Sequence, residues 1–276
     1  MQETYFPIIT KENLKLPIYL HSIGKYFEET DIKRPNGFPA YQWIQCYQGE
    51  GLFVYDKEEY IIKEGQGIFI YPTTPHYYYA TKKPWKTHWI AFDGYSIHSL
   101  LNIIGITKTD IYNILDPNIL KNKIITCFQL STSNNLYTSI ETSAYLYQFF
   151  IDLVKNTKPI YNNSLYQHYS KLQPVIDYID TYYSQPLSID LLAKQINVTP
   201  QYLCILFQKI MQKRPFEYIN EVRIKKSKEL ILNNYNYPIT TISTKVGFES
   251  PSYFGSQFKK IEGITPGQFK QLYISS

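Results

Sequence analysis

Two stretches near the end of the chain repeat one another. Phe207-Gln-Lys-Ile210-Met-Gln-Lys-Arg-Pro215-Phe-Glu-Tyr218 is echoed by Phe258-Lys-Lys-Ile261-Glu-Gly-Ile-Thr-Pro266-Gly-Gln-Phe269, an offset of 51 residues. Upstream, Ala193…Asn197-Val198 is echoed by Ser243…Gly247-Phe248 at an offset of 50, so the second copy has one additional residue in its turn. Self-similarity at a fixed offset predicts two copies of one small supersecondary unit.

The first copy is expected to form two short helices joined by a tight turn. Ser188 and Thr199 are suited to cap the two helices, and Pro200 fits the first position of the second helix. Asn197 tolerates the left-handed backbone conformation that a helix stop requires. The apolar side chains expected on the inner face are Ile189, Leu192, Leu203, Leu206, Phe207 and Ile210.

The second copy follows the same plan. Gly247 takes the place of Asn197 at the turn, and Ser243 takes the place of Ala193 as the small residue that lets the second helix approach closely. This combination is typical of a helix-turn-helix motif. We therefore predict two tandem helix-turn-helix units joined by a helix over 215–234. A generic helical bundle is the alternative interpretation.

The charge of the chain is distributed unevenly. Its 276 residues include 28 basic and 23 acidic ones, a net charge of +5. Residues 1–168 contain 15 of each kind, so the last 108 residues, with 13 basic and 8 acidic, carry the whole surplus. Such an asymmetry indicates an anionic partner such as nucleic acid for the C-terminal part; a solvated, lysine-rich surface is the alternative.

The first half of the chain has the pattern of a β domain. From about residue 16 to 92, short β-branched and aromatic runs are separated by turns at a spacing of about 8–12 residues, which predicts an antiparallel sandwich or barrel. Helical periodicity follows over 95–105 and more strongly over Tyr137–Val154. The broad apolar face of the second helix would pack either on the barrel or on a second subunit.

The length of the chain exceeds the ~100–200 residues of one ordinary domain. Residues 155–170 show no hydrophobic periodicity and are rich in Asn, Ser and Pro, which is typical of a linker. We therefore predict a two-domain α+β protein. Residues 1–154 form an N-terminal β-barrel with flanking helices, and residues 171–276 form an all-α domain with two helix-turn-helix units.

Several classes of protein are excluded by composition. Cys46, Cys127 and Cys204 lie far apart with no histidine beside them, which excludes a zinc knuckle or a disulfide framework and suits a reducing compartment. All three are expected to be buried thiols. The apolar runs fall far short of the ~18 residues of a membrane span. The first residues, Met1-Gln-Glu-Thr, lack the basic and apolar stretches of a secretory signal, so we expect none. We expect a cytoplasmic protein without a membrane partner.

Three segments near the C-terminus carry a more specific pattern: Arg223-Ile-Lys-Lys-Ser-Lys-Glu-Leu, Val246-Gly-Phe-Glu-Ser-Pro-Ser-Tyr-Phe254 and Gly263-Ile-Thr-Pro-Gly-Gln-Phe-Lys270. Over about 170–276 the chain resembles the AraC/XylS family of bacterial transcription regulators. The resemblance implies that the second helix of each unit enters the major groove of double-stranded DNA, at sites about 34 Å apart. It also implies RNA polymerase as a partner.

Family members often carry arginine, which reads guanine, at the positions of Ile205 and Ser256. Its absence here predicts weak guanine readout and an A·T-rich site. The side chains expected to reach base edges are Gln201, Cys204, Ile205, Gln208, Ser252 and Ser256. Those expected to contact phosphates are Lys209, Lys213, Arg214, Lys225, Lys259 and Lys260.

The glycine turns at 49–51 and 65–67, the run Pro72-Thr-Thr-Pro75-His76 and the run Trp85-Lys-Thr-His-Trp89 resemble the cupin-type sensing domain of the same family. Catalytic cupins hold a metal through a His-x-His pair, a carboxylate and a later histidine. Here three tyrosines follow His76, so we expect no metal, no cofactor and no enzymatic activity.

Aromatic rings and hydroxyl groups are abundant in this half and suit a small polar ligand such as a carbohydrate. The residues expected to bind it are Gln48, His76, Tyr78, Thr87 and Trp89. The sequence thus predicts a sequence-specific DNA-binding activator, gated by that ligand and dimeric through the helix over Tyr137–Val154. The alternative is a non-metal cupin-type binding protein or enzyme whose helical tail mediates protein contacts.

Overall fold

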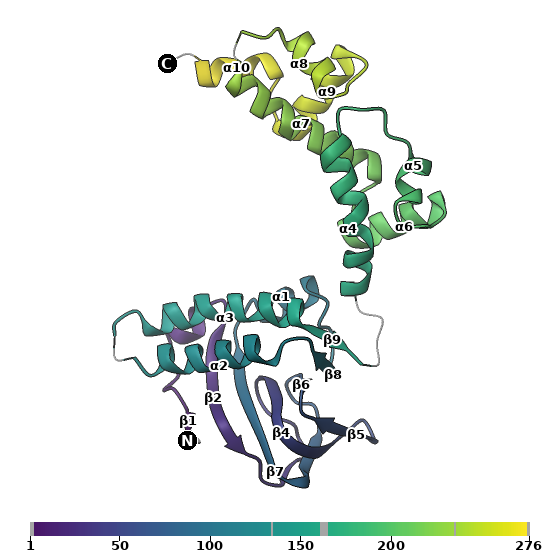
Figure 1. Cartoon of the computed structure of the whole chain (residues 1–276). Helices are drawn as coiled ribbons and strands as arrows, with labels where there is room; N and C mark the ends of the chain where they lie inside the picture. Colours follow the sequence, from purple (N-terminus) through teal and green to yellow (C-terminus); the bar gives the residue numbers. More distant parts are fainter. Residues whose placement is uncertain (1–2, 134, 161–164, 235, 275–276) are drawn as a thin grey trace. The chain divides into compact units, whose positions relative to one another are not determined.

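The computed structural model describes residues 3–133, 135–160, 165–234 and 236–274. The chain forms two compact units, residues 1–166 and 167–276, one rich in strands and one helical (Figure 1). The predicted α+β two-domain class is therefore confirmed. Within the described ranges, no helix combines the length and the apolarity needed to cross a membrane.

The N-terminal unit is built on one curved antiparallel sheet, as expected of a cupin-like barrel. Its nine strands in the described residues are β1 (Glu3–Tyr5), β2 (Tyr19–Glu28), β3 (Ile32–Arg34), β4 (Tyr41–Tyr55), β5 (Glu58–Lys63), β6 (Gln66–Ile70), β7 (His76–Asp93), β8 (Asp110–Ile114) and β9 (Thr157–Pro159). They run in the order β1-β2-β7-β4-β6-β8-β9, with β3 added to β7 and β5 to β4. The long strands β4 and β7 pair with register shifts near Gln48, which mark bulges that bend the sheet.

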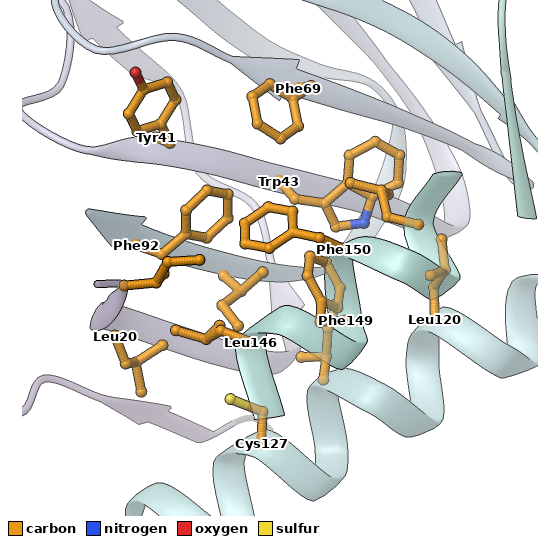
Figure 2. Packing of buried hydrophobic residues seen from close by; sticks show 14 of the residues in the cluster. Leu20, Tyr41, Trp43, Phe69, Phe92, Leu120, Cys127, Leu146, Phe149 and Phe150 are labelled. Carbon is orange, nitrogen blue, oxygen red and sulfur yellow. The ribbon is translucent and has the colours of Figure 1, made fainter. Parts of the chain in front are cut away.

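Helices cover one face of this sheet. They are α1 (Ile97–Ile103), α2 (Pro117–Ser131) and α3 (Thr138–Asn156). Residues 3–15, from β1 to a 3-10 turn, η1 (Asn13–Lys15), form the N-terminal arm. Phe149 and Phe150 of α3 are fully buried against Trp43 and Phe92 of the sheet (Figure 2). Each such ring contributes about 1.5–3 kcal/mol to stability. The opposite face of the sheet forms a second core around Ile44.

The apolar side chains of α3 divide into two faces. Leu146 and Phe150 are buried, whereas Ile140, Tyr147 and Ile151 are 58%, 37% and 45% exposed. The helix predicted over Tyr137–Val154 thus packs on its own sheet with one face and presents a second apolar face to solvent.

The predicted linker over residues 155–170 was wrong in its described part. Helix α3 continues to Asn156, β9 pairs with β8, and α4 (Leu165–Tyr182) has already begun before residue 170. The pairing of β9 depends on a partner strand more than forty residues earlier in the chain, so local periodicity could not reveal it. The predicted boundary at 154 is therefore too early, and residues 161–164 lie outside the described residues.

The C-terminal unit is helical throughout its described residues. After α4 come α5 (Ile189–Lys194), α6 (Pro200–Met211), α7 (Pro215–Asn233), α8 (Ile239–Lys245), α9 (Pro251–Glu262) and α10 (Pro266–Ile274). Helices α5 and α6 form the first helix-turn-helix unit and α8 and α9 the second. Thr199 and Ser250 cap α6 and α9 by accepting hydrogen bonds from the backbone N–H groups of Tyr202 (3.2 Å) and Tyr253 (3.3 Å).

Both turns adopt the predicted left-handed conformation, with φ of 53° at Asn197 and 90° at Gly247. Helix α7 joins the two units because it contributes to both of their cores. Ile219 packs in the core of the first unit, and Ile231 packs in that of the second.

Candidate DNA interface and ligand cavity

Helix α6 presents a continuous exposed face to solvent. Leu203, Leu206, Phe207 and Ile210 are buried and hold the helix against the first unit. The predicted base-reading residues Gln201, Cys204, Ile205 and Gln208 are all exposed. Their spacing of i, i+3, i+4 and i+7 places them on one side of the helix. Cys204 was expected to be buried; Cys46 and Cys127 are buried, but Cys204 is exposed because it lies on this outer face.

Helix α9 presents the corresponding face in the second unit. Phe254 and Phe258 are buried, and Ser252 and Ser256 are exposed. The hydroxyl of Ser256 donates a hydrogen bond to the carbonyl of Tyr253 in its own helix (2.8 Å), so towards a DNA base it is an acceptor. The face therefore offers short side chains rather than long hydrogen-bond donors.

The residues predicted to contact phosphates are exposed with one exception. Lys209, Arg214, Lys225, Lys259 and Lys260 are exposed. Lys213 is half-buried and bonds both carboxylate oxygens of Glu221, at 2.8 and 2.7 Å.

Arg223, which belongs to the sequence pattern that resembles the family, makes its contacts within the C-terminal unit. Its guanidinium donates to the carbonyls of Tyr183 (2.7 Å) and Gln185 (2.9 Å) and lies over the ring of Phe248. Arg223 thus ties the loop after α4 to the second helix-turn-helix unit.

Two exposed tyrosines, Tyr202 and Tyr253, lie at the start of the outer faces of α6 and α9. Sequence reasoning missed both as candidates for DNA contact.

A cluster of buried polar residues lies within the N-terminal sheet. Thr87 donates a hydrogen bond of 2.5 Å to the carboxyl of Glu29, which is 7% exposed. Burial raises the pKa of Glu29 to about 7, against the opposing effects of this hydrogen bond and of the charge on Arg34. Burial also raises the pKa of Tyr78, whose phenol lies in the field of Glu29 and Arg34.

Arg34 brings a positive charge into this cluster. Its Nη1 donates to the neutral amide oxygen of Gln42 (2.7 Å), and its guanidinium stacks on Phe38 at 4.5 Å. That bond to Gln42 is the single hydrogen bond of the guanidinium within the described residues, although arginine has five N–H donors. The remaining donors can serve a ligand.

His76 contributes an acceptor to the cluster. Its Nδ1 lies 2.7 Å from the carbonyl oxygen of Thr74, and because a carbonyl only accepts, Nδ1 carries the proton. Nε2 is then an acceptor, and it is buried without a partner among the described residues. Burial lowers the pKa of His76, so the ring is neutral at neutral pH. A pocket of about 980 Å³ opens beside it, lined by Tyr55, Tyr71, Thr74 and Thr109 among others.

The structure brings together three of the five residues predicted to bind the ligand. His76, Tyr78 and Thr87 belong to the cluster, and Trp89 follows Thr87 on the same face of β7. Gln48 does not join them, since it is exposed at the bulges of β4.

Sequence reasoning missed Glu29, Arg34 and Gln42. For Arg34 a signal existed: the chain has three arginines, and Arg34 alone precedes residue 214. The described residues contain no group of three His, Cys, Asp or Glu side chains placed to hold a metal ion.

Comparison with known proteins matches both units. Residues 23–150 match the AraC-like ligand binding domain, and residues 192–272 match a helix-turn-helix domain. The chain is 27% identical over 227 residues to the lactose operon transcription activator of Staphylococcus xylosus, covering 81% of each chain. It is 23% identical over 228 residues to the raffinose operon transcriptional regulatory protein RafR of Pediococcus pentosaceus, covering 81% of this chain and 82% of that one.

A solved structure, the C-terminal domain of the response regulator AraT from Geobacillus stearothermophilus, is 28% identical with a TM-score of 0.35, over 37% of this chain and 84% of that one. The two domain matches and the two operon regulators define a DNA-binding transcription regulator. The chain belongs to the AraC/XylS family.

Proposed function

We propose that this regulator activates a carbohydrate operon and is gated by a sugar bound at the buried polar cluster of its N-terminal unit. The observation that carries the proposal is the cluster itself, defined by Glu29, Arg34, Gln42, His76, Tyr78 and Thr87. The similarity of the chain to regulators of a lactose operon and a raffinose operon supports a carbohydrate as the ligand. As an activator, the protein would also contact RNA polymerase.

The cluster matches the hydrogen-bonding capacity of a sugar. A sugar hydroxyl both donates and accepts, so it needs acceptors and donors side by side. Nε2 of His76 and the second oxygen of Glu29 would accept from hydroxyls, and Arg34 would donate to them. The ring of Trp89 on the same face of β7 would stack on the C–H face of the sugar.

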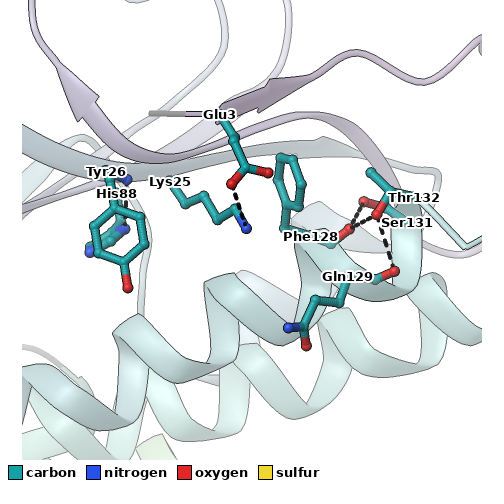
Figure 3. A network of polar contacts seen from close by, with 8 residues as sticks. All are labelled: Glu3, Lys25, Tyr26, His88, Phe128, Gln129, Ser131 and Thr132. Atoms are coloured by element: carbon teal, nitrogen blue, oxygen red, sulfur yellow. Dashed lines mark hydrogen bonds and ion pairs between the residues drawn. The ribbon is translucent and has the colours of Figure 1, made fainter. Parts of the chain in front are cut away.

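The N-terminal arm is the element through which we propose that the ligand acts. Its first described residue, Glu3, pairs with Lys25 of β2 (3.2 Å; Figure 3). Phe6 of the arm contacts Trp89, with ring centroids 6.1 Å apart, although Phe6 itself is 66% exposed. A ligand that contacts Trp89 would therefore change how the arm packs. It can shift the protein towards its active arrangement only if it binds that arrangement more tightly.

The exposed apolar face of α3 supports a homodimer. Ile140, Ala144, Tyr147 and Ile151 recur at helical spacing on the side of α3 that faces solvent. A second copy of this face is its proposed partner. Ile151→Asp is expected to shift the protein to a monomer in sedimentation experiments. Asn36→Asp, at an exposed polar position after β3 and away from α3, should leave the dimer intact.

Ligand binding can be tested by thermal unfolding against a panel of mono- and disaccharides. All three tryptophans lie in the N-terminal unit, so their fluorescence follows this unit alone. One sugar should raise the midpoint by several degrees, and Arg34→Leu should abolish that shift. Lys63→Leu, at an exposed position at the end of β5 that does not line the pocket beside His76, is the matched control. A shift that persists in Arg34→Leu, or the absence of any responding sugar, would contradict the proposal.

DNA binding is tested separately by mobility shift with A·T-rich promoter fragments. The full-length protein should bind in low salt, and the sugar identified above should change its affinity or the pattern of its complexes.

A further inference from the structure

The outer faces of α6 and α9 differ in chemistry at equivalent positions. The offset of 51 residues relates four positions of α6 to four of α9: Gln201, Cys204, Ile205 and Gln208 to Ser252, Gly255, Ser256 and Lys259. Helix α6 thus presents a thiol and a branched alkyl group where α9 has a hydrogen atom and a hydroxyl group. Two helices that hold the same place in the repeat therefore offer different groups to DNA.

Ile205 is the main apolar group on the outer face of α6. It is 64% exposed, and it belongs neither to the core of the first unit nor to the half-buried residues packed against that core. A single exposed isoleucine is common on protein surfaces and by itself needs no partner. This one differs because it lies between Gln201 and Gln208, on the side of the second helix that a helix-turn-helix unit turns towards base edges.

The tyrosines at the start of both outer faces already have partners within the protein. The ammonium of Lys171 on α4 lies 4.9 Å from the centre of the Tyr202 ring. The hydroxyl of Tyr253 accepts a hydrogen bond from the side-chain amide of Asn220 on α7 (3.1 Å). On α6, Ile205 is then the large exposed apolar side chain without such a contact among the described residues.

The major groove offers one apolar group at its base edges, the 5-methyl group of thymine. The other groups exposed there are hydrogen-bond donors and acceptors, which an alkyl chain cannot satisfy. The amides of Gln201 and Gln208 are suited to bond N6 and N7 of adenine, the base that pairs with thymine. The outer face of α6 therefore matches both bases of an A·T pair.

The outer face of α9 has no equivalent of Ile205. A Cβ added at Gly255 would meet no atom within 4 Å, so no neighbouring side chain fills the space there. The hydroxyl of Ser256 donates to the carbonyl of Tyr253 in its own helix. Neither position brings an alkyl chain to a base edge.

We infer that Ile205 reads the 5-methyl group of thymine in the DNA segment that α6 contacts, and that the segment contacted by α9 is read without a methyl contact. Burial of one methyl group against an alkyl chain increases affinity about fourfold. This dependence on thymine methyl groups belongs to one half of the operator, so it distinguishes the two ends of the site. The inference rests on the DNA-binding activity of the family and is independent of the sugar.

Removal of single methyl groups from the DNA tests the inference. A duplex that the full-length protein selects from a random-sequence pool in low salt is resynthesised with each thymine replaced in turn by uracil, which removes only the methyl group. Fluorescence anisotropy should show an affinity about fourfold lower at one or two neighbouring positions in one half of the site. Equal affinity for all uracil duplexes would overturn the inference. Failure to select any duplex would overturn DNA binding as well.

Three variants assign the methyl contact to Ile205. Ile205→Ala should bind the thymine and uracil duplexes equally, and the high helix propensity of alanine keeps α6 folded. Ile205→Val keeps a branched alkyl chain and should retain most of the difference. Leu232→Ala, which removes an exposed apolar side chain of α7, is the matched control and should show the full difference. A fourfold difference that persists in Ile205→Ala would overturn the assignment, because the residue and the methyl group would then not be coupled.

Cytosine at the sensitive position gives the converse test. Methylation of cytosine at C5 places a methyl group where thymine carries its own. The wild-type protein should bind the 5-methylcytosine duplex about fourfold more tightly than the cytosine duplex, and Ile205→Ala should bind the two equally. The absence of any gain in the wild-type protein, or the same gain in both proteins, would contradict the role of Ile205.

Discussion

Thr87 on β7 donates a hydrogen bond to the carboxyl of Glu29, and both side chains are buried in the sheet. Burial raises the pKa of Glu29 from 4.5 to about 7. Between these values the folded protein keeps a proton that the unfolded chain releases. The contribution of Glu29 to the free energy of unfolding is therefore smallest above pH 7. It falls by about 3 kcal/mol as the pH rises from about 4.5 to 7.

The Glu29→Gln variant isolates this effect. His88, whose pKa burial lowers to about 4, changes stability in the opposite direction over the same range, so the difference between wild type and variant is the informative quantity. The stability of Glu29→Gln relative to wild type should increase from pH 5 to pH 8 in urea unfolding followed by tryptophan fluorescence. A difference that is constant with pH would show that Glu29 is already ionised at pH 5.

The exposed lysines at the end of α9 should supply affinity without sequence preference. Lys260→Ala is expected to weaken binding to all DNA sequences alike and to reduce the slope of log K against log salt by about 0.9. Lys226→Ala is the control, because the ammonium of Lys226 pairs with Glu229 at 2.9 Å on α7. Salt titrations of DNA binding by fluorescence anisotropy would measure both slopes, and equal slopes for the two variants would contradict the assignment of Lys260.

The short side chains of α9 should be open to a gain of specificity. Ser256→Arg places a bidentate guanine reader on the exposed face and should add about 1–3 kcal/mol of preference for guanine at one base pair. Thr240→Arg adds the same charge at an exposed position of α8, so it should raise affinity without that preference. Binding to a set of duplexes that differ by single base pairs separates the two. An unchanged profile for Ser256→Arg would show that this face does not meet the bases.

The caps and turns of the helical unit could be predicted because each depends on a few neighbouring residues. Thr199 caps α6 through the third residue along, and Asn197 turns the chain by its own conformation. The polar cluster of the N-terminal unit could not be predicted in the same way. Arg34 meets Gln42, and Glu29 meets Thr87 across 58 residues, through strand pairings that the local sequence does not encode.

The exposed position of Gln48 also could not be predicted from the local sequence. Alternation along β4 predicts an inward side chain, but a bulge adds a residue and changes which face the following side chains occupy. The helix α2 was likewise not predicted, although Asp116 caps its start by accepting from the N–H of Asn118 (3.0 Å).

Substitution of two glycines in the second helix-turn-helix unit should change its stability in opposite directions. Gly247 has φ of 90°, and a Cβ there would lie 2.7 Å from the carbonyl oxygen of Ser184, so Gly247→Ala should destabilise the unit by about 1–3 kcal/mol. Gly255 is helical, and a Cβ added there would meet no atom within 4 Å, so Gly255→Ala should stabilise the unit by about 1 kcal/mol. Thermal unfolding followed by far-UV circular dichroism would compare them, and a loss of stability in Gly255→Ala would contradict this interpretation of α9.

Helix α7 sets a constraint on the promoters that this protein can serve. Its 19 residues correspond to a rigid rod of about 28 Å, and its side chains are shared by the cores of both helix-turn-helix units. Inserting one base pair between the two contacted segments would turn one of them by about a tenth of a helical turn relative to the other. Because the rod cannot turn with it, operators should vary in base sequence far more readily than in spacing.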